Sequence, residues 1–323
     1  MSPDGAALAA RLREGDLGAA PAALNLIESS APVEREQAAM LLAALSPAAL
    51  GSEPHGHVIG LTGPPGVGKS TLLSALLAHW RTAGRSVAIL AVDPSSRRSG
   101  GSLLGDRARI EFDPADRAVL IRSTAAGERL GGIAPATGEA AQALAAAFDV
   151  VVIETLGVGQ AETEVADVAD TVAVIVQPGG GDTLQFLKSG IMEIPDVLVV
   201  TKADLGQLAD RTRRDLGAAL RSLGARDTSL VAVSSLRPPQ GIEELAEALD
   251  RHRARSDVPA RRDAGRRAGA LREFEAEHGR AGVRRLGGHR VAQQQLAGCT
   301  PGLDAGSLAA VLEQRLADAD ARP

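Results

Sequence analysis

Hydrophobic positions along this chain follow two different periods. Between residues 4 and 48, apolar residues recur three or four positions apart, as in Leu8 and Leu12 or Leu24 and Ile27, and this spacing predicts helices. From residue 57 the pattern changes to short apolar runs with helical segments between them. The runs are HVIGLT (57–62), SVAILAV (86–92), AVLIRS (118–123), VVVIET (150–155), TVAVIV (171–176), DVLVVT (196–201) and SLVAVS (229–234). Such runs are typical of strands buried on both faces, and the intervening helices imply βαβ crossovers, so we expect an α/β domain with a doubly wound, mostly parallel sheet of about seven strands.

The same pattern divides the chain into three regions. We expect an N-terminal helical region over 1–55, an α/β domain over 56–250 and a C-terminal helical region over 251–323. The turn-rich stretch from Ser46 to Gly56 is typical of a linker. Residues 251–267 contain seven Arg. This run indicates a solvated linker or helix face, with a contact surface for phosphate or an acidic partner as the alternative.

Composition excludes several classes of protein. The 323 residues carry a net charge of −5 and only 2% aromatic residues, so the chain lacks the basic, base-stacking surface of a nucleic-acid binder. The single cysteine, Cys299, excludes a disulfide framework and a multi-Cys zinc site. There is no apolar run of about 18 residues that would suggest a membrane span, and the charged N-terminal residues do not resemble a signal peptide. We therefore expect a cytoplasmic protein with no nucleic-acid or membrane partner.

A glycine-rich segment follows the first predicted strand. Residues 63–71, GPPGVGKST, fit the pattern G-x-x-x-x-G-K-[ST] and lie directly before an apolar helical run. The glycines allow backbone N–H groups to face phosphate oxygens, and the helix N-terminus adds partial positive charge. Lys69 is predicted to reach the β- and γ-phosphates, and Ser70 to ligate Mg²⁺. The predicted nucleotide-binding residues of this P-loop NTPase domain are Gly63, Pro64, Pro65, Gly66, Val67, Gly68, Lys69, Ser70 and Thr71.

A second motif favours a guanine nucleotide. Residues 201–204, TKAD, follow a predicted strand at the place where G-proteins carry N-K-x-D. The Asp204 carboxylate can accept hydrogen bonds from guanine N1–H and the 2-amino group, and Lys202 can lay its aliphatic stem over the base. Thr201 stands in place of the Asn, which weakens one contact to the base or the loop. The alternative for Asp204 is a helix cap. Further predicted nucleotide contacts follow the last strand, at Ser234, Ser235 and Leu236.

Three longer segments, together with the P-loop, carry a family resemblance. They are VDPSSRRSGGSLLGDRARI (92–110), ETLGVGQAE (154–162) and QPGGGDTLQFLKSGIMEIPDVLVVTKAD (177–204). Over about residues 57–250 the chain resembles the G-protein chaperones of adenosylcobalamin-dependent acyl-CoA mutases, the MeaB/ArgK-like family. The resemblance implies a Mg²⁺-dependent GTPase that converts GTP to GDP and phosphate. It also implies a homodimer joined partly through the C-terminal helices. The implied partner is a B12-dependent acyl-CoA mutase. The protein would gate the delivery of adenosylcobalamin to this mutase and would protect or reactivate it.

Several acidic residues of these segments are candidates for chemistry at the γ-phosphate. Asp93 and Glu154 end predicted strands, where ligands bind in open α/β sheets, and their carboxylates can hold a metal-bound water or orient the attacking water. Gly157 can offer a backbone N–H to the γ-phosphate. The alternatives are ordinary loop or cap carboxylates. The catalytic candidates are Lys69, Asp93 and Glu154, and the candidates near Mg²⁺ are Ser70, Asp93, Asp106 and Glu154, some through water.

Other functions remain open on the sequence. A nickel-insertion metallochaperone GTPase shares the fold type, but such proteins usually have Cys or His clusters, and here His55 and His57 form the only close His pair. A P-loop kinase would need an acceptor pocket with a general base, for which no segment is dedicated. A non-hydrolysing scaffold is disfavoured because Lys69, Ser70 and Asp93 are all present.

Overall fold

The chain folds into two compact units. The computed structural model describes residues 3–93, 110–125, 134–155, 161–179, 195–225 and 227–320. What we call the sheet unit falls within His57–Ala134 and Phe148–Asp257, and the terminal unit within Met1–Gly56, Pro135–Ala147 and Val258–Pro323. Helix α6 (Pro135–Ala145) belongs to the terminal unit, although its residues lie within the range 56–250 that the sequence predicts as the α/β domain.

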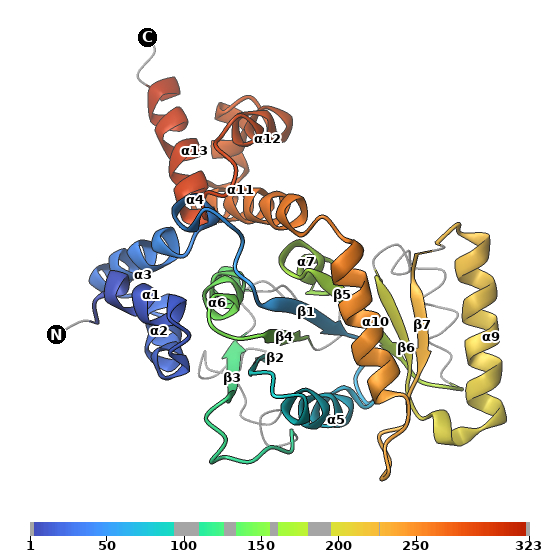
Figure 1. Cartoon of the computed structure of the whole chain (residues 1–323). Coiled ribbons are helices and arrows are strands. Elements are labelled where there is room, and N and C mark those ends of the chain that lie inside the picture. Colours follow the sequence, from blue (N-terminus) through green and yellow to red (C-terminus); the bar gives the residue numbers. More distant parts are fainter. Residues whose placement is uncertain are drawn as a thin grey trace, which may run out of the picture. The chain divides into compact units, whose positions relative to one another are not determined.

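A seven-stranded sheet organises the sheet unit (Figure 1). Its strands are β1 (His57–Thr62), β2 (Val87–Asp93), β3 (Val119–Ala125), β4 (Val150–Glu154), β5 (Thr171–Val176), β6 (Val197–Val200) and β7 (Ser229–Ala232). They lie in the order β3-β2-β4-β1-β5-β6-β7, and each neighbouring pair is parallel. The predicted α/β fold with a parallel sheet is thus confirmed. Because β1 lies between β4 and β5, the loops that follow these three strands emerge next to one another, at the sheet edge where such folds bind ligands.

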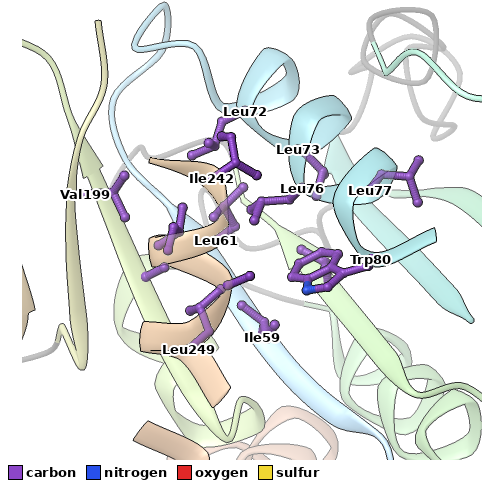
Figure 2. Packing of buried hydrophobic residues seen from close by; sticks show 14 of the residues in the cluster. Ile59, Leu61, Leu72, Leu73, Leu76, Leu77, Trp80, Val199, Ile242 and Leu249 are labelled. Carbon is purple, nitrogen blue, oxygen red and sulfur yellow. The ribbon is translucent and has the colours of Figure 1, made fainter. Parts of the chain in front are cut away.

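Two helices bury their apolar faces against one side of the sheet. These are α5 (Lys69–Thr82) and α10 (Ile242–Arg255), and their shared core is drawn in Figure 2. The contributing side chains include Leu72, Leu76, Trp80, Ile242 and Leu249, which meet Ile59 and Leu61 of β1. The remaining helices of the sheet unit are α7 (Ala161–Val168), the short η4 (Ala203–Leu205) and α9 (Gln207–Ser222).

Gly60, between Ile59 and Leu61 on β1, shows how closely helix α7 covers the face of the sheet opposite to α5 and α10. Side chains alternate along a strand, so a side chain at position 60 would lie on that opposite face. A Cβ placed on Gly60 would lie 2.5 Å from a methyl carbon of Val165 on α7. The missing side chain therefore lets α7 approach the centre of the sheet.

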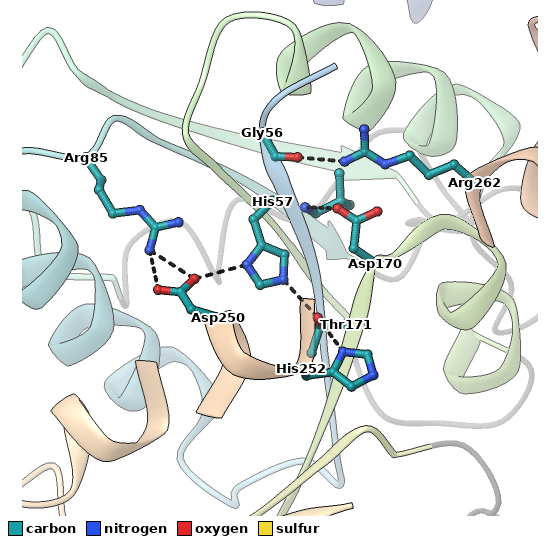
Figure 3. Close-up of polar contacts among 9 residues, drawn as sticks. Gly56, His57, Arg85, Asp170, Thr171, Asp250, His252 and Arg262 are labelled. Atoms are coloured by element: carbon teal, nitrogen blue, oxygen red, sulfur yellow. Dashed lines mark hydrogen bonds and ion pairs between the residues drawn. The ribbon is translucent and has the colours of Figure 1, made fainter. Parts of the chain in front are cut away.

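A buried polar network crosses the N-terminal edge of the sheet (Figure 3). His57 is fully buried; its Nε2 lies 2.9 Å from Thr171 Oγ1, and its Nδ1 lies 3.4 Å from Asp250 Oδ1. The Thr171 hydroxyl also lies 2.9 Å from Nδ1 of His252. Nε2 of His252 is 3.1 Å from an Asp196 carboxylate oxygen. These contacts fasten α10 to β1, β5 and the start of β6. Burial lowers the pKa of His57 despite the nearby carboxylate of Asp250.

The terminal unit is helical. Its helices are α1 (Gly5–Arg13), η1 (Leu17–Ala19), α2 (Ala20–Ile27), α3 (Pro32–Ala44), α4 (Pro47–Leu50), α6, α11 (Val258–Arg285), α12 (His289–Ala297) and α13 (Ala305–Asp320). Asp4 is the N-cap of helix α1, and its carboxylate accepts hydrogen bonds from the N–H groups of Ala6 and Ala7. Helix α11 is kinked at Gly279, where φ is +63°. Helices α11, α12 and α13 of the terminal unit share a core around the fully buried Phe274.

The arginine-rich run over 251–267 has structural partners. Arg262 donates to the carbonyl oxygens of Pro54 at 2.7 Å and Gly56 at 2.6 Å. Arg266, which is buried, forms a two-point ion pair with Glu53 at 2.8 and 3.1 Å. These arginines hold the segment before β1 to α11, so this part of the run is neither a solvated face nor an open phosphate site. No helix among the described residues is both long and apolar enough to span a bilayer.

Candidate nucleotide-binding site

The glycine-rich loop leaves β1 and turns directly into α5. Gly63 has φ +149°, and a Cβ there would lie 2.3 Å from the carbonyl oxygen of Ile175. Gly66 and Gly68 have φ values of +79° and +96°, and Gly68 is the N-cap of α5. A side chain is therefore excluded by contact at Gly63 and is strained at the other two positions. The loop curls as the sequence predicts and leads directly into the N-terminus of α5, whose first N–H groups have no acceptor within the helix itself.

Lys69 folds back over this loop. Its Nζ donates to the carbonyl oxygens of Gly63 at 2.6 Å and Pro64 at 3.0 Å, and the residue is only 9% exposed. The ammonium group is a compact charge with three donors. It is therefore held at the mouth of the loop, where the predicted phosphate contacts would form.

Two predicted metal-site residues from different elements lie in contact. Ser70, in the first turn of α5, donates its hydroxyl to Glu154 Oε1 at 3.1 Å. Glu154 is the last residue of β4, is 5% exposed, and pairs in register with Leu61 of β1. A hydroxyl and a carboxylate are hard oxygen donors of the kind that Mg²⁺ prefers, so this pair fits the ion.

The other predicted residues near the γ-phosphate are only partly described. Asp93 is the last residue of β2, where its backbone lies in register with Ala125; its side chain lies outside the described part of the structure. Asp106 and Gly157 also lie outside the described residues.

A cavity of about 420 Å³ lies next to the P-loop. It is walled by the P-loop, the start of α5 and the ends of β2 and β4; its lining residues are Pro65, Gly66, Gly68, Lys69, Ser70, Thr71, Ala91, Val92, Glu154 and Thr155. The volume lies in the ordinary range of small-molecule sites. Thr155 was not among the predicted residues. Its buried hydroxyl donates to Thr62 Oγ1 at 2.8 Å and so joins the ends of β1 and β4.

The predicted base-reading residues lie together beyond β6 and β7. Lys202 adopts a left-handed conformation, with φ +54°, and its Nζ donates to Oε1 of Gln177 at the end of β5. Asp204 is exposed, and its Oδ1 accepts a hydrogen bond from Ser234 Oγ at 2.7 Å. Ser234 is buried and also accepts from the N–H of Leu236 at 3.3 Å. The two motifs, thirty residues apart in sequence, therefore form one cluster.

Two further residues shape this cluster, and sequence reasoning missed both. The backbones of Ser234 and Gln240 exchange hydrogen bonds at 3.0 and 2.9 Å and close the loop that carries Ser235 and Leu236. Gln177 holds Lys202 from the neighbouring strand. Gln177 directly follows β5, which is a signal that could have indicated it, whereas Gln240 lies at the far end of the loop after β7 and no local pattern indicates it.

Thr201 makes contacts different from those expected of it. Its side chain is buried, and Oγ1 lies 2.8 Å from the carbonyl oxygen of Val67 in the P-loop and 3.1 Å from that of Val176 in β5. The contact to the phosphate loop is thus made by the Thr hydroxyl.

One group elsewhere has metal-ligand spacing. Glu277, His278 and Glu313 of the terminal unit each offer a ligand atom, and these atoms lie within 4.8 Å of one another. Both carboxylates are exposed, and exposed acidic groups often come together without an ion. We assign no ion to this group.

Comparison with known proteins identifies the family. The model of the methylmalonyl Co-A mutase-associated GTPase MeaB family matches residues 20–280. The chain belongs to this family. The MeaB match extends beyond the sheet unit into both flanking helical regions, so it covers the site and part of the terminal unit.

Individual relatives agree with the family match. A probable GTPase of Mycobacterium tuberculosis is 42% identical over 253 residues, which are 76% of this chain and 74% of that protein. The mitochondrial methylmalonic aciduria type A homolog of Caenorhabditis elegans is 36% identical over 251 residues, 74% of this chain and 63% of that protein. Among solved structures, one described as an LAO/AO transport system kinase is 26% identical with a TM-score of 0.65, and the match covers 97% of this chain and 96% of that one.

Proposed function

We propose that this MeaB-family protein hydrolyses GTP to GDP and phosphate at the P-loop cavity, with Mg²⁺ bound at Ser70. The observation that carries this proposal is the 3.1 Å contact between the Ser70 hydroxyl and Glu154 beside the buried ammonium of Lys69. A cation, a hydroxyl and a carboxylate thus line the same cavity of about 420 Å³. The Asp204–Ser234 pair supports guanine as the base, since the carboxylate is already oriented.

Each residue has a role that follows from its chemistry. The loop N–H groups from Gly66 to Ser70 bind phosphate oxygens, and Lys69 leaves its carbonyl partners to neutralise charge on the β- and γ-phosphates. Ser70 would hold the Mg²⁺, and Glu154 would hold a metal-bound water or orient the attacking water. When bound, the ion would neutralise charge that develops on the transferred phosphoryl group. From their positions in the sequence we assign Asp93 to the attacking water or a Mg²⁺-bound water, Asp106 to the Mg²⁺ shell and Gly157 to the γ-phosphate.

Phosphate release tests the reaction. Glu154→Gln keeps the shape of the side chain and removes its charge; we expect it to slow GTP turnover at least a hundredfold while GDP affinity falls much less. Glu243→Gln, in the exposed first turn of α10, is the matched control and should behave as wild type. Label from the γ-phosphate must appear as free phosphate. Label transferred to another molecule would instead support a kinase, and equal turnover of ATP and GTP would contradict the role of Asp204.

We further propose that the protein is a chaperone for an adenosylcobalamin-dependent acyl-CoA mutase, gating cofactor loading and protecting or reactivating that enzyme. The family description and the name of the C. elegans relative support this. A pull-down from native lysate with a GTP analogue or with GDP should capture such a mutase in at least one state. Single-turnover hydrolysis should accelerate when the mutase is added. No mutase in either state would refute the partner.

The C-terminal region over 251–323 is proposed to carry a homodimer contact. Its helices α11 to α13 have their own core around Phe274, which gives such an arm a rigid surface. Sedimentation velocity across a range of concentrations should give the mass of a dimer. A monomer at every concentration, with and without nucleotide, would refute this proposal.

A further inference from the structure

Thr201 stands at the junction between the phosphate loop and the base-reading loop. It follows β6, its backbone N–H donates to the Val176 carbonyl at 2.9 Å, and its side chain is 3% exposed. Its hydroxyl lies 2.8 Å from the Val67 carbonyl oxygen and 3.1 Å from the Val176 carbonyl oxygen. A threonine hydroxyl has one proton, and a carbonyl oxygen can only accept. The proton is therefore committed to the main chain, chiefly to the nearer Val67.

The Val67 carbonyl determines where the next N–H points. A trans peptide is planar, and its C=O and N–H point in opposite directions. When Thr201 holds the Val67 carbonyl, the N–H of Gly68 points the other way. Gly68 lines the cavity and has a φ of +96°, a value that is open to glycine but strained for other residues. Because glycine has no side chain, its own conformational preference does not fix the orientation of the peptide that joins Val67 to Gly68. The Thr201 hydroxyl supplies the constraint that the glycine lacks.

We propose that Thr201 is a positioning residue for phosphate binding, which aims the Gly68 N–H into the cavity and does not read the base. The inference rests on the proposed nucleotide site and assigns a task within it. Base recognition then falls to Asp204, which Ser234 orients. Phosphate affinity should depend on Thr201, and the discrimination between bases should not.

Two ligands separate these tasks. GTP carries a base, whereas inorganic tripolyphosphate has only the phosphate chain. With Mg²⁺ present, Thr201→Val should weaken the binding of both ligands by a similar factor of roughly ten, because a buried carbonyl loses its donor. Thr201→Ser retains the hydroxyl and should bind both within about twofold of wild type. Asp204→Asn should weaken GTP and leave tripolyphosphate unchanged.

Amide hydrogen exchange gives a second measurement without any ligand. Exchange in the peptide that contains Gly68 should be faster in Thr201→Val than in wild type or Thr201→Ser, while the peptide that contains Asp204 should be unchanged. A variant that weakens GTP but leaves tripolyphosphate binding intact would make Thr201 a base-reading residue and overturn the proposal. Unchanged affinity for both ligands would also overturn it. If wild type preferred ATP but Thr201→Val still weakened tripolyphosphate, the guanine assignment would fail and the positioning role would stand.

Discussion

Glu139 on α6 makes the stability of the terminal unit depend on pH. Burial, together with the charges of Glu273 and Asp304, raises the pKa of Glu139 from 4.5 to about 7, although Arg35 acts in the opposite direction. Above pH 7 the carboxylate is ionised in both folded and unfolded chains, and the folded state carries the full cost. A shift from 4.5 to 7, at 1.36 kcal/mol per pKa unit, corresponds to roughly 3 kcal/mol.

Glu139→Gln removes the titrating group and keeps its size. Below pH 4.5 the folded and unfolded wild-type chains are both protonated, so wild type and variant should unfold at the same urea concentration. As pH rises from 4.5 to 7, ionisation of Glu139 destabilises the wild type relative to the variant, which lacks this carboxylate, so the gap should grow to roughly 3 kcal/mol in favour of Gln. The free energy of unfolding is measured in urea at several pH values, with hydrogen exchange in α3 and α6 assigning the transition to the terminal unit.

Glu36→Gln is the matched control, since this carboxylate is exposed on α3 of the same unit. It should show no gap that depends on pH. If Glu139→Gln and wild type lost stability in parallel between pH 4.5 and 7, Glu139 would not be the titrating group and the reasoning from burial and like charge would be refuted.

Three other predictions concern the sheet unit. Gly63→Ala should lower the free energy of unfolding by more than the roughly 1–3 kcal/mol that backbone strain alone costs, because the new Cβ would also lie 2.3 Å from the Ile175 carbonyl oxygen. The same change should abolish GDP binding. Gly51→Ala is the control for strain alone in thermal melts, since Gly51 has φ +78° and no neighbour within 4 Å of an added Cβ. His57 has a lowered pKa, so the unfolded chain takes up its proton first as pH falls below 6.5, and this group should cost the wild type up to about 1.4 kcal/mol per pH unit there relative to a variant without it. Urea titrations of His57→Gln should lack that loss, and an identical pH slope would refute it. Trp80→Ala removes one of the largest buried side chains and should cost about 3–5 kcal/mol by circular dichroism melts, with Trp80→Phe costing clearly less; equal costs would argue against a cavity.

Each strand of the fold was predictable because burial on both faces leaves a local signature. The seven apolar runs each overlap one strand, with ends shifted by a few residues at most, as for β2 at Val87–Asp93. The P-loop was equally readable, since its glycines and Lys69 are needed at fixed spacing by local backbone geometry. The pairing of Asp204 with Ser234 was indicated only by the position of both residues after strands.

Contacts between distant segments were decided by tertiary structure. The helical pattern of α6 predicts an amphipathic helix but not that it joins the terminal unit. A run of arginines indicates solvent, yet Arg266 is buried against Glu53, more than two hundred residues away in the chain. The pKa of Glu139 is raised by burial and by the charges of Glu273 and Asp304, and no local pattern places these two carboxylates beside it.

Thr201 shows most clearly what each level determines. By itself the sequence determined that this residue ends a buried strand in a guanine-type motif and differs from the expected Asn. Only the tertiary structure decided that its hydroxyl meets the Val67 carbonyl, 134 positions away. Secondary structure follows from the period of neighbouring side chains, which any window of sequence contains. The partner of a buried hydroxyl depends on how β5, β6 and the P-loop pack together, and that packing is a collective property of the whole sheet unit.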